Sequence, residues 1–199
     1  MGFLLVDCNG DCGKECNQVI EQTISPALEA VRSAGIKAIY LYNEPLPDGQ
    51  QSMEQEIHRL RRGQAPSEVP WRYSAPIWSA RIRPTPDEPV IAKCAQSGFV
   101  NTFLDRYLRS WGIDTLITVG FSFKSCLFYT MIDAFHLNYR VIFLRDATNP
   151  PGTNEFVDTI NPELPEQGWV RLVLTRLIED HLGYTSTTNE LIASIKQLI

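Results

Sequence analysis

Short apolar runs alternate with amphipathic segments along almost the whole chain. The runs are four to six residues long, which is the length of a buried strand, and the segments between them carry apolar residues at helical spacing. This alternation predicts an α/β fold, a three-layer αβα arrangement with helices on both faces of a mostly parallel sheet. The predicted strands are residues 2–6, 37–42, 89–92, 114–119 and 139–144.

The predicted helices cover residues 14–33, 53–62, 101–111 and 169–181, and a Thr187-x-x-Glu190 capping box opens a last one. Gly35, Gly112 and Gly183 are expected to end the helices that they follow. Residues 63–89 contain six prolines and little periodicity, so we expect a long connection. Its aromatic residues favour a packed lid, although a subunit interface would also account for them.

Length and composition limit the class of protein. A chain of 199 residues with 44% hydrophobic residues suits one domain over residues 1–199. The net charge of -5 argues against a nucleic-acid surface. No apolar stretch approaches the length of a membrane span, so we expect a cytoplasmic protein. Five cysteines, an odd number, indicate reduced thiols rather than a disulfide framework.

The stretch 116–135 reads as strand, sharp turn and helix, with Cys126 at the start of the helix. A thiol there faces unpaired backbone N–H groups and the positive end of the helix dipole, which we expect to favour the thiolate. Cys126 is therefore a candidate nucleophile, although a lone cysteine in such a place is more often a small buried residue.

Two other strand ends supply chemically complementary groups. Asp7 follows the first predicted strand, and Lys93 follows the third. Ligands of parallel sheets bind at the carboxyl ends of the strands, so the three side chains are expected to meet there. A base, a cation and a thiol nucleophile together indicate acyl transfer.

The residues around these positions resemble the isochorismatase-like cysteine hydrolases. The resemblance rests on Asp7 after FLLV, on Lys93 before SGFVNTFLDRYLRSWGIDTLITVG, and on Cys126 within SCLFYTMIDAF. It implies a three-layer α/β fold, a catalytic triad of Asp7, Lys93 and Cys126, and a homo-oligomer, either a dimer or a tetramer. It also implies a cis peptide at Phe121-Ser122, with the N–H groups of Ser122 and Cys126 forming the oxyanion hole.

Within that family the sequence favours hydrolysis of a C–N bond in a small amide or carbamoyl compound through a Cys126 thioester. The SGFVNTFLD run resembles the branch that acts on ureidoacrylate, biuret or N-carbamoyl amino acids. Nicotinamidases carry a metal site built from histidines, whereas His58, His136 and His181 are scattered here, so we expect no metal and no cofactor. The expected substrate-binding residues are Asn43, Trp78, Phe99 and Tyr129.

Three alternatives stay open at this point. The protein could cleave a vinyl ether, as isochorismatase does, or be a non-catalytic binding or assembly protein on the same fold. The stretch LLVDCNGD also faintly resembles the aspartyl-phosphate loop of haloacid-dehalogenase phosphatases, but Asn9 occupies the place of the second aspartate that this loop needs.

Overall fold

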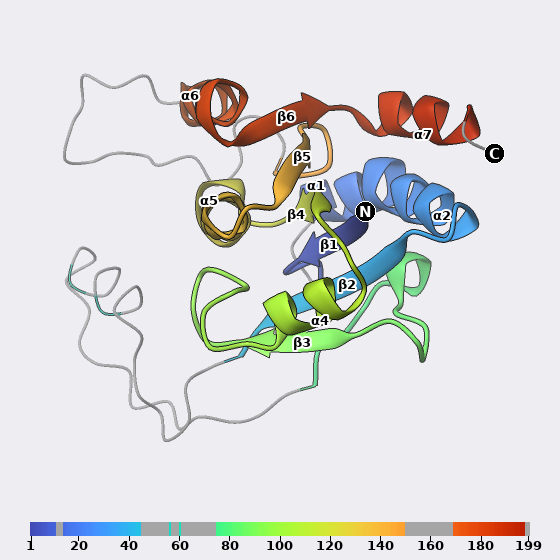
Figure 1. Cartoon of the computed structure of the whole chain (residues 1–199), viewed down its shortest axis with the longest axis horizontal. Coiled ribbons are helices and arrows are strands. Elements are labelled where there is room, and N and C mark those ends of the chain that lie inside the picture. Colours follow the sequence, from blue (N-terminus) through green and yellow to red (C-terminus); the bar gives the residue numbers. More distant parts are fainter. Residues whose placement is uncertain (11–13, 45–55, 57–59, 61–74, 150–168, 198–199) are drawn as a thin grey trace.

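The computed structural model describes residues 1–10, 14–44, 56, 60, 75–149 and 169–197. Six parallel strands form one sheet in the order β3-β2-β1-β4-β5-β6 (Figure 1). The predicted parallel sheet is therefore confirmed. The strands are β1 (Gly2–Val6), β2 (Lys37–Asn43), β3 (Val90–Lys93), β4 (Thr115–Gly120), β5 (Arg140–Leu144) and β6 (Gly183–Ser186).

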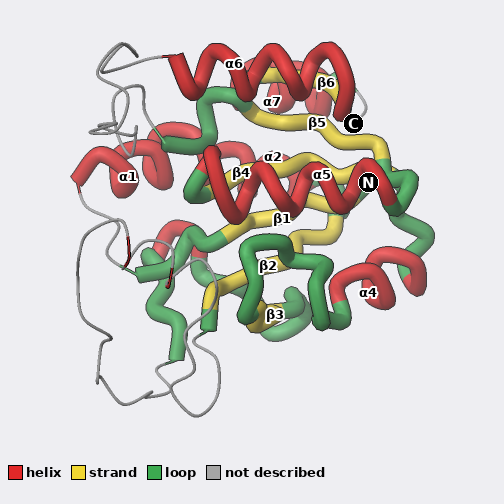
Figure 2. The backbone as a smooth tube through the Cα atoms, turned by 90° about the vertical axis from the view of Figure 1, so that its left-hand side faces the viewer, coloured by secondary structure: helices red, strands yellow, loops and turns green. Residues whose placement is uncertain are grey.

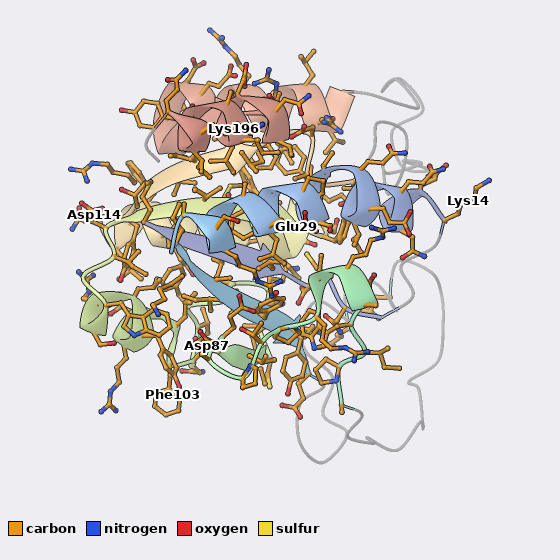
Figure 3. All side chains as sticks on the ribbon, turned by 90° about the vertical axis from the view of Figure 1, so that its right-hand side faces the viewer. Lys14, Glu29, Asp87, Phe103, Asp114 and Lys196 are labelled. Carbon is orange, nitrogen blue, oxygen red and sulfur yellow. The ribbon has the colours of Figure 1, made fainter. Side chains whose placement is uncertain are left out.

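Helices cover both faces of the sheet. One face carries α1 (Lys14–Val19), the π-helical turn η1 (Ile20–Ile24), α2 (Ser25–Ser33) and α7 (Thr188–Lys196). The other carries α4 (Leu104–Ser110), the π-turn η4 (Phe123–Leu127), α5 (Phe128–His136), α6 (Trp169–Leu177) and the π-turn η5 (Ile178–Leu182). Figure 2 shows α5 and α6 in front of the sheet, and Figure 3 views the molecule from the side of α2 and α7. The expected three-layer fold is confirmed.

Alternation within β1 explains why both faces are covered. Phe3 and Leu5 join the core under α2, whereas Leu4 and Val6 join the core under α5, and all four are fully buried. A strand buried on both faces is continuously apolar, as this one is in the sequence.

The helical segments follow the predictions closely. Residues 14–33 are helical throughout, and Gly35 follows with a φ of 70°, the left-handed conformation that glycine adopts without steric cost. The capping box of Thr187 and Glu190 opens α7, as predicted. The helix expected over 101–111 begins later, at Leu104, because Asn101 has a φ of 55° and the Thr102 hydroxyl accepts the Leu104 N–H.

β6 was not among the predicted strands. Its four residues GYTS are half-buried or exposed and contain no apolar run, so they carry no strand signal. Gly183 was interpreted only as the end of a helix, but a Cβ there would lie 2.3 Å from the Val141 carbonyl oxygen. Gly183 therefore allows the close pairing of β6 with β5.

Several predictions fall wholly or partly outside the described residues. They concern the helix over 53–62, most of the connection over 63–89, and Cys12, one of the five cysteines expected to be reduced thiols. The extent of the domain over residues 1–199 also stays a prediction. The described part of the connection contains the 3-10 helix η3 (Ala80–Ile82). Among the described residues, Cys8, Cys16, Cys94 and Cys126 form no disulfide bond. Among the described residues, no helix has both the length and the apolar character needed to cross a bilayer.

Candidate active site

The strand order brings three functional side chains to one point of the sheet. The chain runs from β1 to β2 and β3 on one side, and then returns to β4 and β5 on the other. Ligands of such sheets bind where this reversal occurs, beyond the carboxyl ends of the strands. Asp7 directly follows β1, Lys93 is the last residue of β3, and Cys126 follows β4 after a short turn.

Lys93 is the residue at which these groups meet, and only 1% of its surface is exposed. Its Nζ lies 2.9 Å from Oδ2 of Asp7 and 3.3 Å from Sγ of Cys126. It also donates hydrogen bonds to Oδ1 of Asn43 at 3.4 Å and to the Ala95 carbonyl at 3.3 Å. A buried ammonium is stable only when it is paired in this way.

Asp7 is fixed through its backbone as well as by Lys93. Its N–H donates to the Leu41 carbonyl at 3.0 Å, and its φ of 51° lies in a region that aspartate tolerates better than most residues. Oδ1 is buried and has no hydrogen-bond partner among the described residues. Buried polar atoms are nearly always paired, so an oxygen without a partner calls for one. A proton or a substrate N–H would supply it.

The surroundings of Cys126 raise the pKa of its thiol to about 11. Burial is the largest cause, the negative charge of Asp7 adds to it, and the ammonium of Lys93 opposes both. The expectation that this position would favour the thiolate is therefore wrong, because burial and the neighbouring carboxylate raise the pKa more than the Lys93 ammonium lowers it. The thiol is the resting form at neutral pH, so a base must remove its proton before it can attack.

The turn between β4 and η4 has the backbone geometry that the resemblance implied. The Phe121-Ser122 peptide is cis. The carbonyl of Ser122 accepts the N–H groups of Ser125 and Leu127. Among the described residues, the N–H of Ser122 has no hydrogen-bond acceptor, and the N–H of Cys126 lies within η4. Their assignment as oxyanion donors stays a prediction.

Gly120 allows this turn to lie against β1. Its φ of 121° is one that side chains rarely permit, and an added Cβ would lie 2.0 Å from the Val6 carbonyl oxygen. Because the ends of β1 and β4 pair in register here, any larger residue would push Asp7 and Cys126 apart.

Asn43 and Tyr129 have exposed side chains, one at the end of β2 and the other in the first turn of α5. Asn43 accepts a hydrogen bond from Lys93, so it helps to hold the ammonium, a role that the sequence did not predict. The ring of Tyr129 contacts the ring of Phe128 and is 48% exposed. Their contact with substrate stays a prediction.

Phe99 and Trp78 pack against core aromatic rings. Phe99 stacks on Tyr139 with the ring centroids 5.8 Å apart. The rings of Trp78 and Tyr40 pack edge to face, with their centroids 5.1 Å apart. These contacts show that both rings pack within the fold. Their place in a substrate pocket stays a prediction.

Two buried polar residues beside the site, Thr148 and Asn149, were not predicted from the sequence. They are 1% and 5% exposed, and Oδ1 of Asn149 accepts the N–H of Phe123, the first residue of η4, at 2.8 Å. In the sequence Asn149 only marks a break before two prolines. Asn149 lies 26 residues after the start of η4 that it caps, so the sequence around η4 does not reveal the contact.

Fold and site together define a doubly wound α/β protein with a thiol, an ammonium and a carboxylate at its switch point. The isochorismatase domain model matches residues 2–176. The chain therefore belongs to the isochorismatase family, as the motifs around Lys93 and Cys126 indicated.

The chain is similar in sequence or in structure to several named proteins. The chain is 29% identical over 188 residues to the ureidoacrylate amidohydrolase RutB of Rhizobium rhizogenes, which covers 87% of this chain and 70% of that protein. A cysteine hydrolase from Pseudomonas syringae pv. phaseolicola 1448A has a similar structure, with a TM-score of 0.74 and 23% identity over 100% of this chain and 93% of that one. N-carbamoylsarcosine amidase from Thermoplasma acidophilum gives a TM-score of 0.65 and 24% identity over 94% of this chain and 95% of that one. At these identities the two structures confirm the fold alone.

Proposed function

We propose that this protein is a cysteine-dependent amidohydrolase that cleaves a C–N bond of a small amide, carbamoyl or ureido compound. The observation that carries the proposal is the buried Lys93 ammonium, which contacts the Asp7 carboxylate and the Cys126 thiol at once. The proposed reaction requires no metal or other cofactor, because Asp7, Lys93 and Cys126 supply the base, the cation and the nucleophile.

In the first half of the reaction, Asp7 accepts the thiol proton and the Cys126 sulfur attacks the carbonyl carbon. The negative charge that develops on the carbonyl oxygen is held by the N–H groups of Ser122 and Cys126. One such donor contributes roughly 10²–10³ in rate. When the C–N bond breaks, the proton on Asp7 passes to the leaving amine, and the acyl group remains as a thioester.

In the second half, Asp7 takes a proton from water as that water attacks the thioester carbon. The C–S bond breaks, the acid product leaves, and the proton on Asp7 returns to the sulfur. The Lys93 ammonium lies 2.9 Å from the Asp7 carboxylate and 3.3 Å from the Cys126 sulfur, so it holds the base and the nucleophile in place throughout.

The substrate class follows from two observations. The relative RutB, named above, acts on ureidoacrylate, which carries a carbamoyl nitrogen. Oδ1 of Asp7 is a buried acceptor without a partner among the described residues, which suits the N–H of an amide or urea. We therefore place this chain with the carbamoyl and ureido hydrolases rather than with the vinyl-ether hydrolases.

An ammonia-release screen across ureidoacrylate, biuret, N-carbamoyl amino acids and nicotinamide tests the proposal. We expect release from a ureido or carbamoyl compound, and loss of that release in Cys126→Ala and Cys126→Ser. Cys94→Ala is the matched control, because Cys94 is an exposed thiol beside Lys93 and outside the triad, and it should retain native turnover.

Other outcomes would point elsewhere. Ammonia release that survives in Cys126→Ala would rule out the thioester route. Cleavage of a vinyl ether without any amide turnover would favour the isochorismatase reaction. A native protein that turns over none of these compounds and whose Cys126 stays inert toward iodoacetamide would favour a binding or assembly role.

We also propose that the protein acts in the cytoplasm as a homo-oligomer, a dimer or a tetramer. Large apolar side chains that are 41–73% exposed lie on the outer helices α5 and α6, which supports a subunit contact there. They are Tyr129, Phe135, Leu172, Val173 and Leu177.

A further inference from the structure

The segment that follows β5 is bonded to the turn that carries the proposed oxyanion donors. β4 and β5 are neighbours in the sheet, so the loops beyond their ends lie side by side (Figure 1). The Gly120 N–H donates to the Ala147 carbonyl at 2.9 Å. The Thr148 hydroxyl donates to the Gly120 carbonyl at 2.6 Å, and Asn149 accepts the Phe123 N–H at 2.8 Å.

These three bonds bracket the Phe121-Ser122 peptide, since two lie before it, at Gly120, and one lies after it, at Phe123. The direction of the Ser122 N–H is set by the plane of that peptide, and the plane is fixed when the residues on both sides are fixed. Thr148 and Asn149 are almost fully buried, so little water competes for these bonds.

The segment is itself anchored from outside. Arg171 of α6 donates one hydrogen bond to the Asn149 carbonyl at 2.8 Å and another to the Arg145 carbonyl. The Asp146 carboxylate accepts the N–H of Thr188, the first residue of α7, at 2.9 Å. Residues 145–149 are thus bonded to α6 and α7, and they also fix the loop that follows β4.

We propose that Thr148 and Asn149 are positioning residues for catalysis, which clamp the turn so that the N–H groups of Ser122 and Cys126 face the developing oxyanion. The inference rests on the proposed function, because it assigns a catalytic consequence to the clamp. Donors stabilise a transition state only when they are held close to their productive geometry, so a small rotation of the turn lowers the rate.

The test compares Thr148→Val, which keeps the shape but removes the hydroxyl, with Thr148→Ser, which retains the hydroxyl. Asn149→Leu removes the acceptor for Phe123 in the same way. We expect kcat for the best substrate to fall by roughly 10-fold or more in Thr148→Val and Asn149→Leu, and by no more than the roughly 10²–10³ that one oxyanion donor is worth. KM should stay within about threefold of native, and Thr148→Ser should restore most of kcat.

Two further readouts separate positioning from general damage. Alkylation of Cys126 by iodoacetamide forms no oxyanion, so its rate should be native in all three variants. Thr118→Val is the matched control, because Thr118 is a fully buried threonine of β4 whose hydroxyl also donates to a backbone carbonyl, that of Ile142. It should keep the native kcat.

Native kcat in both Thr148→Val and Asn149→Leu would overturn the proposal, and so would an equal loss in Thr118→Val. If the native protein hydrolyses no amide, the proposed function fails, and the clamp is then judged by amide hydrogen exchange. Faster exchange of the Gly120 and Phe123 N–H groups in the two variants would support the clamp, and unchanged exchange would overturn it.

Discussion

Asp7 and Lys93 act on the thiol of Cys126 in opposite directions. The carboxylate raises the pKa of the thiol and the ammonium lowers it, while burial adds to the effect of the carboxylate. The nucleophile is therefore protonated at rest and is activated by transfer of its proton to Asp7. This differs from an enzyme whose thiolate is formed in advance by a helix terminus or a neighbouring cation.

Asp7→Asn separates the two roles of the carboxylate. Removing the negative charge should lower the pKa of the Cys126 thiol, so alkylation by iodoacetamide at pH 8 should be faster than in the native protein. Amide turnover should nevertheless fall by roughly 10²–10⁴, because the proton acceptor is lost. Peptide mass spectrometry of Cys126 over a range of pH measures the first effect, and ammonia release measures the second. Slower alkylation in Asp7→Asn would contradict the assigned sign.

At the scale of elements, Gly120 sets how closely β4 approaches β1. Gly120→Ala would place a Cβ 2.0 Å from the Val6 carbonyl oxygen, so we expect a large loss of stability or failure to fold. Gly112→Ala is the control, because Gly112 also has a positive φ, of 62°, but a Cβ there meets nothing within 4 Å. That variant should lose only the conformational term, about 1–2 kcal/mol in urea unfolding. Similar losses in the two variants would show that the close approach is unimportant.

The chain leading into β3 is fastened to α2 by Arg32 and Glu88. The guanidinium donates to both oxygens of Glu88, at 2.8 and 2.6 Å, and also to the hydroxyl of Tyr40. Burial acts to raise the pKa of Glu88, but the bonds from Arg32 and from the Thr85 N–H lower it below its ordinary value. The pair therefore stabilises the fold above the unfolded pKa of about 4.3, and this stabilisation is lost as the pH falls through the lower folded pKa.

Glu88→Gln tests this pH dependence. We expect it to lower the free energy of unfolding by about 1.5–3 kcal/mol at pH 7, the range for hydrogen bonds to charged groups. The difference from native should shrink as the pH falls below about 4, because the native Glu88 is then protonated as well. Urea unfolding at several pH values measures this. Glu29→Gln, at an exposed glutamate of α2, should remain close to native throughout. A difference that grows on acidification would contradict the assignment.

At the scale of the whole molecule, the apolar residues on α5 and α6 predict self-association. Light scattering should give the mass of a dimer or tetramer, and Leu172→Glu should shift it to smaller species, because a charge would be buried at the contact. Phe103→Glu is the matched control, since Phe103 is similarly exposed but directly precedes α4 and points away from the body of the molecule (Figure 3). A native monomer at micromolar concentration would contradict the proposal.

Much of the architecture could be predicted because its signals are local. The strand before Asp7 is an unbroken apolar run, and Asp7, Lys93 and the turn before Cys126 each follow such a run, so a parallel sheet places them at one edge. β6 was not predicted, because a short edge strand of polar residues contains no apolar run. The thiol pKa and the clamp from Thr148 and Asn149 depend on burial and on contacts between distant segments, which no local pattern reveals.

The most direct test of the thioester mechanism is the mass of the Cys126 peptide in a sample quenched with acid during turnover of the best substrate. We predict an added mass equal to the acyl group of that substrate on Cys126 and on no other cysteine, together with loss of turnover in Cys126→Ala. An unmodified Cys126 in a sample that is turning over, with native turnover in Cys126→Ala, would contradict the assignment of Cys126 as the nucleophile.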